Sequence, residues 1–345
     1  MRPDGAGVVA LQPHGQQQQA LNILARMDPP GSSNPTPANP SPAATLRPVH
    51  GAALQRTLDR LSRSRSAPWL HAEVARRMAQ RLGVIKLKPQ VVLDWEARLG
   101  GGGSALRAAY AGDGVRPEVV HVDSAPGPTR DERAGGAAAP WWSPARWRRD
   151  GGVHRTPAQV QAGSAQLVWS NMALHAHADP CAVIAQWHRS LAVDGFLMFS
   201  TLGPGSLPEL RALYGAKAWG PSMAALVDMH DLGDMLVAAG FADPVMDQEH
   251  IVLTWADADA ALAELRSLGA NLDPFRFAGL RTPRWRRHLA QGLREMSPPQ
   301  PDGRVALTFE VAYGHAFRPP TRARVAPQVR VDLADFQAMA RQGRR

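Results

Sequence analysis

The stretch from Ala165 to Leu210 constrains the fold more than any other part of the 345-residue chain. It holds an apolar run that ends in Trp169-Ser170-Asn171, a helical pattern at about 180–192, and a second apolar run that ends in Ser200-Thr201. Two short buried strands joined by a helix form a β-α-β crossover with parallel strands. Because open α/β sheets bind ligands at the carboxyl ends of their strands, these polar residues predict two sides of a pocket.

The rest of the chain continues this alternation of strands and helices. Strands are expected at 91–93, 118–123, 158–161 and 245–255, and alternating strand sequence lies within 304–317. Helices are expected at 66–82 with Ser66 as the cap, at 206–215, at 257–268 and at 283–296. The pattern predicts an α/β fold: a doubly wound, Rossmann-like sheet with a β-rich C-terminal end and helical additions.

The two ends of the chain differ in composition from the part between them. Residues 1–50 combine a glutamine run with PPGSSNPTPANPSP and cannot build a hydrophobic core. The last residues, 318–345, are basic and contain prolines. We therefore expect one folded domain over 54–317, between a disordered N-terminal segment and a flexible basic tail.

Composition limits the environment and the partners of the protein. The single cysteine, Cys181, excludes an intramolecular disulfide and suits a reducing compartment, so a cytoplasmic location is expected. No run of eighteen apolar residues is present, so no membrane span is expected. The net charge of +9 comes from clustered arginines without a nucleic-acid-binding motif, which argues against a nucleic-acid partner. Basic edges instead favour an acidic partner or are simply solvated helix faces.

Acidic residues end the first two expected strands. Asp94 is followed by the glycine run Gly100 to Gly103, and Asp123 closes the second strand. A glycine-rich loop brings backbone amides close to a ligand, and a carboxylate at a strand end accepts two hydrogen bonds from a ribose diol. This arrangement serves both nicotinamide dinucleotides and S-adenosylmethionine, and a flexible turn remains an alternative for the glycine run.

The stretch LVWSNMALHAHADPCAVIAQWHRSLAVDGFLMFSTLGPGSLPELRALY resembles the class I S-adenosylmethionine-dependent methyltransferases, and within them the BioC branch. The marks are WSN after the fourth strand, L-x-x-x-G-x-L-x-F-S-T-L across the fifth, and G-S-L-P-E-L after it. The resemblance spans about Leu54 to Phe317 and implies a methyltransferase-like domain. It implies methylation of the free carboxylate of malonyl-acyl carrier protein in biotin synthesis. The chain also resembles the related mitochondrial complex I assembly factor, so the substrate stays open.

The resemblance assigns roles to residues at the strand ends. Asp94 opens the first cofactor motif, which continues through Glu96, Gly100 and Gly101, and Asp123 matches the acid that binds the ribose hydroxyls. This implies S-adenosylmethionine as the cofactor.

The end of the fourth strand supplies the catalytic side of the expected site. Trp169, Ser170 and Asn171 stand where the methionine part of the cofactor meets the methyl acceptor, and Asn171 also counts as a cofactor contact. Thr201 stands on the acceptor side, after the fifth strand. WSN and FSTL favour methyl transfer over an NAD-dependent oxidoreductase.

The first cofactor motif departs from the family pattern, which has glycines two, four and six residues after the acid. This chain has Glu96, Arg98 and Gly100 at those positions. Glycines there let the backbone approach the cofactor without an intervening side chain. Either cofactor binding is remodelled, or the protein is a non-catalytic relative that binds or assembles other proteins.

Methyl transfer to a carboxylate needs little acid-base machinery, because the nucleophile is already ionised. The acceptor does need a cation to position it. Arg281, Arg284 and Arg287 are the candidates, either for an acceptor carboxylate or for docking an acidic carrier protein. The expected acceptor is acyl carrier protein or a small-molecule carboxylate. The H-x-H-x-D sequence that starts at His175 lies in a loop without further ligands nearby, so no metal site is expected.

Overall fold

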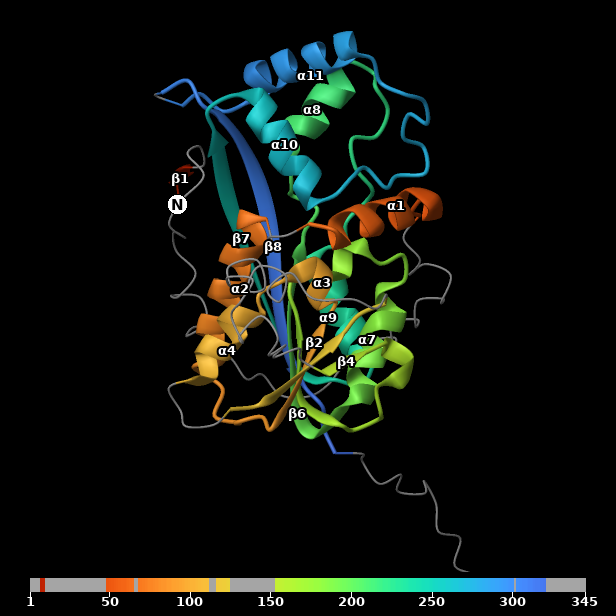
Figure 1. The fold of residues 1–345 in the computed structure, drawn as a ribbon, viewed down its shortest axis with the longest axis vertical. Helices are drawn as coiled ribbons and strands as arrows, with labels where there is room; N and C mark the ends of the chain where they lie inside the picture. The colour runs from red at the N-terminus through yellow and green to blue at the C-terminus, as the bar shows by residue number, and fades with distance from the viewer. Residues whose placement is uncertain are drawn as a thin grey trace, which may run out of the picture.

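The computed structural model describes residues 7–9, 48–64, 68–111, 116–124, 153–300 and 302–320. The described strands form one sheet in the order β1-β7-β8-β6-β5-β2-β3-β4 (Figure 1). Their bounds are β1 Gly7–Val9, β2 Val91–Trp95, β3 Glu118–Val122, β4 Val153–Arg155, β5 Ala165–Ser170, β6 Leu191–Leu202, β7 Ala242–Trp255 and β8 Val305–Phe317.

Strands β2 to β6 run parallel, and β8 runs antiparallel between β6 and β7. The order reverses at β2, which pairs with β3 on one side and with β5 on the other. A reversal of this kind opens a crevice at the carboxyl ends of the central strands, where open α/β sheets bind ligands. The predicted doubly wound α/β sheet is confirmed.

The strand predicted at 158–161 is wrong. The structure has β4 at Val153–Arg155, and Pro157–Gln159 form a single 3₁₀ turn instead. Thr156 and Gln159 cap this turn reciprocally, and Pro157 sits at its first position, where its fixed φ and missing N–H favour a turn over a ladder.

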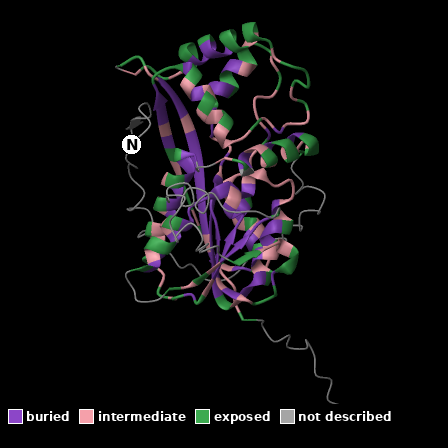
Figure 2. Cartoon of the chain, in the orientation of Figure 1, coloured by how far each residue is buried: buried purple, intermediate pink, exposed green. Residues whose placement is uncertain are grey.

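Helices cover both faces of the sheet. Their bounds are α1 Gly51–Ser62, α2 Trp69–Leu82, α3 Ala97–Gly100, α4 Gly103–Ala111, α7 Pro180–Ser190, α8 Pro208–Ala216, α9 Met229–Ala238, α10 Ala258–Leu268 and α11 Pro283–Met296. Helices α2 and α4 pack in one core with Leu167 and Phe196, and helices α7 and α9 pack in the other with Val168 and Leu197. The central strands are therefore buried on both faces, as parallel sheets require (Figure 2).

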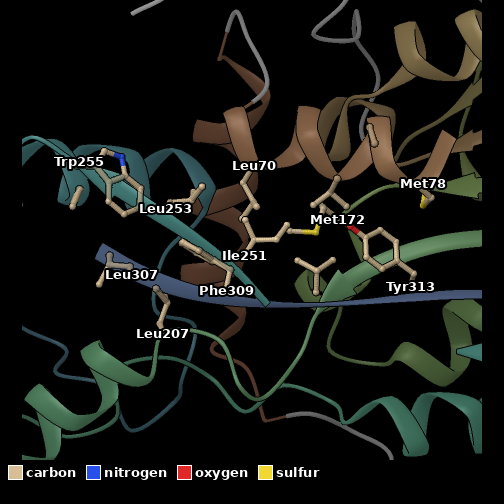
Figure 3. Close-up of a cluster of buried hydrophobic side chains, with 14 of the residues drawn as sticks. Leu70, Met78, Met172, Leu207, Ile251, Leu253, Trp255, Leu307, Phe309 and Tyr313 are labelled. Atoms are coloured by element: carbon tan, nitrogen blue, oxygen red, sulfur yellow. The ribbon is translucent and has the colours of Figure 1, made fainter. Parts of the chain in front are cut away.

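The first of these cores continues into a helical cap. Figure 3 shows Leu70 of α2 beside Ile251 of β7 and Phe309 of β8, and Met78 of α2 further along the cluster, on the side of Tyr313. Helices α8, α10 and α11 gather at the end of the molecule where β7 and β8 project furthest, with α1 lying below them (Figure 1). None of the described helices is long and apolar enough to cross a membrane.

Two boundaries differ from the sequence expectation. Helix α1 begins at Gly51, three residues before the predicted start of the folded domain at 54. The sequence analysis predicts no helix at this position. Helix α2 begins at Trp69 after Pro68, and the proposed cap Ser66 lies outside the described residues. The same holds for most of 1–50 and for the tail from 321, although Gly7–Val9 pair antiparallel with β7.

Candidate active site

The carboxyl ends of four neighbouring strands bring the predicted site residues together. Asp94 lies near the end of β2, Asp123 follows β3, Asn171 follows β5, and Thr201 lies near the end of β6. All four side chains are buried, which makes each unmatched polar atom among them costly unless a ligand or partner satisfies it.

Asn171 ties the glycine turn to the sheet. Its side-chain Nδ2 donates to the carbonyl oxygens of Gly100 at 2.9 Å and His71 at 3.0 Å. Its Oδ1 accepts from Ser200 Oγ at 3.0 Å, and Ser200 Oγ accepts from the backbone N–H of Met172 at 3.1 Å. Because donor and acceptor atoms of the amide are engaged in these contacts, Asn171 holds the glycine turn against the ends of β5 and β6.

The glycine run is a built turn between α3 and α4. A Cβ on Gly100 would lie 1.9 Å from the carbonyl oxygen of Asn171, so no larger residue fits there. Gly101 and Gly102 have φ of 65° and 96°, in the left-handed region that favours glycine. A Cβ on Gly102 would also lie 2.6 Å from the Cβ of Ala75. The close packing and the left-handed dihedrals therefore require glycine at these positions.

Glu96 has a backbone conformation that favours glycine. Its φ of 55° and ψ of 43° are left-handed, an uncommon conformation for a residue with a side chain. Its buried carboxylate accepts from Ser124 Oγ, and its Oε1 lies 3.8 Å from Nε2 of His177. Glu96 thus combines a left-handed backbone with a buried carboxylate directly after β2.

A cavity of about 290 Å³ opens beside this carboxylate. Its walls include Glu96 and Ser124 at the ends of β2 and β3, Pro157 after β4, and His177 with Ala182 from the segment that enters α7. It therefore lies at the carboxyl edge of the parallel strands, where a cofactor is expected.

Asp123 is the group best placed to receive a ligand hydroxyl. Its Oδ1 accepts from the backbone N–H of Arg98 at 2.9 Å, while its buried Oδ2 has no hydrogen-bond partner among the described residues. Burial, reinforced by the nearby carboxylates of Glu96 and Asp94, raises the pKa of Asp123 to about 7, and the Arg98 bond opposes this rise. A buried carboxylate oxygen without a donor fits the ribose hydroxyls of S-adenosylmethionine.

Asp94 lies on β2, the strand that pairs with β3 beside Asp123. Its Oδ2 is 3.2 Å from Nδ1 of His121, its register partner on β3. Neither Asp94 nor Asp123 is among the residues that line the cavity. The structure therefore places Asp94 as a residue that holds β2 against β3 near the site.

The three predicted catalytic residues other than Asn171 lie deeper than expected. Trp169 and Ser170 have no exposed surface, and Trp169 packs in the core between the sheet and α2. Thr201 is buried, with its Oγ1 3.5 Å from Nδ1 of His175. His175 is therefore better placed for direct contact with a substrate than Trp169 or Ser170. The sequence analysis considered His175 only as a metal ligand.

A second, larger cavity of about 790 Å³ begins at His175 and Leu202 and extends under the helical cap. Its walls are mainly apolar side chains of α8, α10 and β8, including Leu210, Leu265 and Phe309. An apolar enclosure next to the strand ends excludes water from an acceptor group.

The predicted substrate arginines do not line this cavity. Arg281 stacks on Phe277 and Trp285, with its guanidinium carbon 3.9 Å and 4.5 Å from the ring centres, and Arg284 and Arg287 are exposed on α11. The arginines on its walls are Arg56, Arg60, Arg266 and Arg276. Sequence reasoning missed these because helix α1, which carries the first two, was not expected.

Replacing Glu96 by glutamine tests the electrostatics of the site. Removing its charge lowers the pKa of Asp123, because one of the carboxylates that raise it is gone. If the ionised form of Asp123 binds the cofactor, the loss of cofactor affinity on acidification starts at a lower pH in Glu96→Gln than in the wild type. Calorimetric titrations with S-adenosylmethionine from pH 5.5 to 8.5, with Glu118→Gln on the exposed start of β3 as the control, measure this shift. An unchanged profile would contradict the coupling.

Comparisons with known proteins give one family. No protein-family model matches the chain. The malonyl-[acyl-carrier protein] O-methyltransferase of Laribacter hongkongensis is 39% identical over 284 residues, which cover 79% of this chain and 90% of that protein. The proteins of the same name from Gallionella capsiferriformans and Methylovorus sp. are each 36% identical, over 73% and 79% of this chain and 85% and 91% of their own lengths.

Among solved structures, the YcgJ protein from Bacillus subtilis has a TM-score of 0.47 at 12% identity and covers 70% of this chain and 98% of its own. The curated relatives match the chain over most of their own length, and the family predicted from WSN and FSTL is confirmed. The chain belongs to the malonyl-[acyl-carrier protein] O-methyltransferase family.

Proposed function

We propose that this protein transfers a methyl group from S-adenosylmethionine to the free carboxylate of malonyl-acyl carrier protein. The observation that carries the proposal is the similarity to five relatives that all bear this activity in their names, at 34–39% identity over 73–79% of this chain. The built glycine turn and the available oxygen of Asp123 support a working cofactor site over the alternative of a non-catalytic relative.

The described residues divide the work of holding the cofactor. Asp123 Oδ2 would accept from the ribose hydroxyls, and the turn at Gly100 and Gly101, held by Asn171, would allow the close approach of the methionine part. The bound cofactor supplies an electrophilic methyl group on a positively charged sulfur. Its positive charge would also favour the ionised form of Asp123.

On the acceptor side, the malonyl carboxylate must be oriented toward the methyl group and kept away from water. A malonyl carboxylate is ionised at neutral pH, so its oxygen is already nucleophilic and no general base is required. The mainly apolar cavity under the helical cap limits the access of water, and His175 on its wall, with Thr201 Oγ1 3.5 Å from its Nδ1, would orient the carboxylate. Catalysis then comes mainly from alignment of the two reactants in a water-excluded site.

Methyl-ester formation on purified substrates tests the proposal. Malonyl-acyl carrier protein should gain one methyl group, detected by intact-protein mass spectrometry, while acetyl-acyl carrier protein, which lacks a free carboxylate, should stay unmodified. Absence of product on malonyl-acyl carrier protein, with a homologous enzyme active in the same assay, would contradict the proposed function. Methylation of free malonate alone would assign a small-molecule acceptor instead.

In the cell we place this reaction in the cytoplasm, as a step of biotin synthesis. Expression of the chain should restore growth without biotin to a bacterium that lacks its own malonyl-acyl carrier protein methyltransferase. An Asp123→Ala variant, which removes the carboxylate expected to hold the cofactor, should fail to restore it.

A further inference from the structure

Three arginines meet where α1 and α10 border the large cavity. Arg56 and Arg60 lie one turn apart on α1, and Arg266 lies in the last turn of α10. All three line the cavity, although 206 residues separate Arg60 from Arg266 along the chain. These three side chains form the arginine cluster.

Backbone contacts fix the middle member of the cluster. The Arg60 guanidinium donates to the carbonyl oxygen of Arg266 at 2.7 Å and to that of Gly269 at 2.7 Å. Burial and the neighbouring positive charge of Arg266 lower the pKa of Arg60. Two like charges are thus held close together by the fold, which is unfavourable unless an anion joins them.

No anion of the described part of the chain does so. Within the described residues, Arg56, Arg60 and Arg266 form no ion pair with a carboxylate, whereas Arg81 and Arg286 each form one and Arg77 forms two. Guanidinium groups that line one cavity wall without a paired carboxylate are suited to the several oxygens of a phosphate or a carboxylate supplied by a ligand.

The expected substrate carries two anionic groups, a phosphate on its arm and the carboxylate that is methylated. The exposure of the cluster indicates which of the two it binds. Arg56 and Arg266 are exposed and Arg60 is half-buried, so the cluster lies at the mouth of the cavity. The carboxylate that is methylated must instead reach the buried strand ends near His175 and Leu202, where water is excluded. The apolar wall between these two places suits an extended, mostly uncharged chain.

We propose that Arg56, Arg60 and Arg266 bind the phosphate of the phosphopantetheine arm on which acyl carrier protein presents the malonyl group. The proposal rests on the proposed function, since that activity supplies the arm. The arm would enter past the cluster, run along the apolar wall and present its malonyl end at His175. The cluster would therefore fix how deeply the arm enters.

A substrate pair that differs only in the phosphate tests this assignment. Malonyl thioesters of pantetheine and of 4′-phosphopantetheine are compared as methyl acceptors by the ratio of their kcat/KM values. The wild type should prefer the phosphorylated substrate by roughly tenfold or more, as expected for charge-assisted hydrogen bonds. Arg56→Ala/Arg266→Ala should abolish this preference by raising KM, with kcat little changed. Arg211→Ala, an exposed arginine of α8 outside the cavity wall, should keep it.

Two results would overturn the assignment. One is a wild type that does not distinguish the two substrates, and the other is a double variant that loses equal activity on both, which would place the malonyl carboxylate at the cluster. Failure of the proposed function has a separate signature, namely no methyl ester from any malonyl substrate. Calorimetric binding of 4′-phosphopantetheine to the wild type and the double variant then decides the assignment without turnover: phosphate-dependent binding lost in the double variant supports it, and equal binding contradicts it.

Discussion

Gly100→Ala is expected to abolish cofactor binding and to lower the free energy of unfolding by about 3 kcal/mol or more. The added Cβ would lie 1.9 Å from the carbonyl oxygen of Asn171, and 2.9 Å from its carbonyl carbon, so the backbone of one segment must move. A movement of the Gly100 segment or of the Asn171 segment breaks the hydrogen bonds by which Asn171 holds the turn. Chemical denaturation and calorimetric titration with S-adenosylmethionine measure the two effects.

A glycine in open space serves as the matched control. A Cβ on Gly215, in helix α8, would meet no atom within 4 Å, so Gly215→Ala should leave cofactor affinity unchanged and stabilise the helix by about 0.5–1 kcal/mol. If Gly100→Ala binds the cofactor as the wild type does, the turn is not the close-approach element described above.

Asp123→Asn is expected to weaken cofactor binding about a hundredfold while it stabilises the free protein at pH 8. Asparagine keeps the shape of the side chain and an oxygen for the Arg98 N–H, but it replaces a charged acceptor of the ribose hydroxyls with an amide. The same change removes a carboxylate whose ionisation is opposed by burial and by Glu96 and Asp94.

The stability effect depends on pH with a definite sign. The pKa of Asp123 is raised in the folded state, from 3.8 to about 7, so folding favours the protonated form. The contribution of this group to stability is therefore fully present below pH 3.8 and is lost as pH rises to about 7, with a magnitude on the order of 4 kcal/mol. Asp123→Asn should thus exceed the wild type in stability at pH 8 and differ little from it at pH 4.

Denaturation at both pH values, with and without S-adenosylmethionine, measures these differences. Saturating cofactor should narrow the difference at pH 8 by up to about 2.7 kcal/mol, the free energy of a hundredfold difference in affinity, because it stabilises the wild type more than the variant. A variant that is less stable than the wild type at pH 8 without cofactor would show that the carboxylate is held by favourable contacts in the free protein.

The fold could be predicted because its strands carry their own signals. Buried runs that end in Asp94, Asp123 and Asn171, with a helical pattern between the last two strands, are typical of parallel strands with their ends at one edge. The predicted position of β4 is wrong because only three residues form it, and Pro157 follows two residues after its end. Short edge strands carry too few residues for a periodic pattern.

The site could be predicted less completely, because a local sequence pattern does not determine where a side chain points or which distant segments pack together. Trp169 and Asn171 stand two residues apart, yet one packs in the core while the other binds the glycine turn. Glu96 shows no signal of its left-handed backbone beyond standing where the pattern of the class I methyltransferases has glycine. Arg60 meets Arg266 only through the packing of α1 on α10.

Titration of the wild-type protein with S-adenosylmethionine tests most directly whether the cofactor site survives the loss of two motif glycines. The left-handed turn at Glu96, the Gly100 turn and the available Oδ2 of Asp123 predict saturable binding of one cofactor per chain, with micromolar affinity. Because Asp123 has a pKa of about 7 in the free protein, binding at pH 7 should also release protons, measured as a dependence of the heat on the ionisation enthalpy of the buffer. No saturable binding at millimolar S-adenosylmethionine would contradict the site described here.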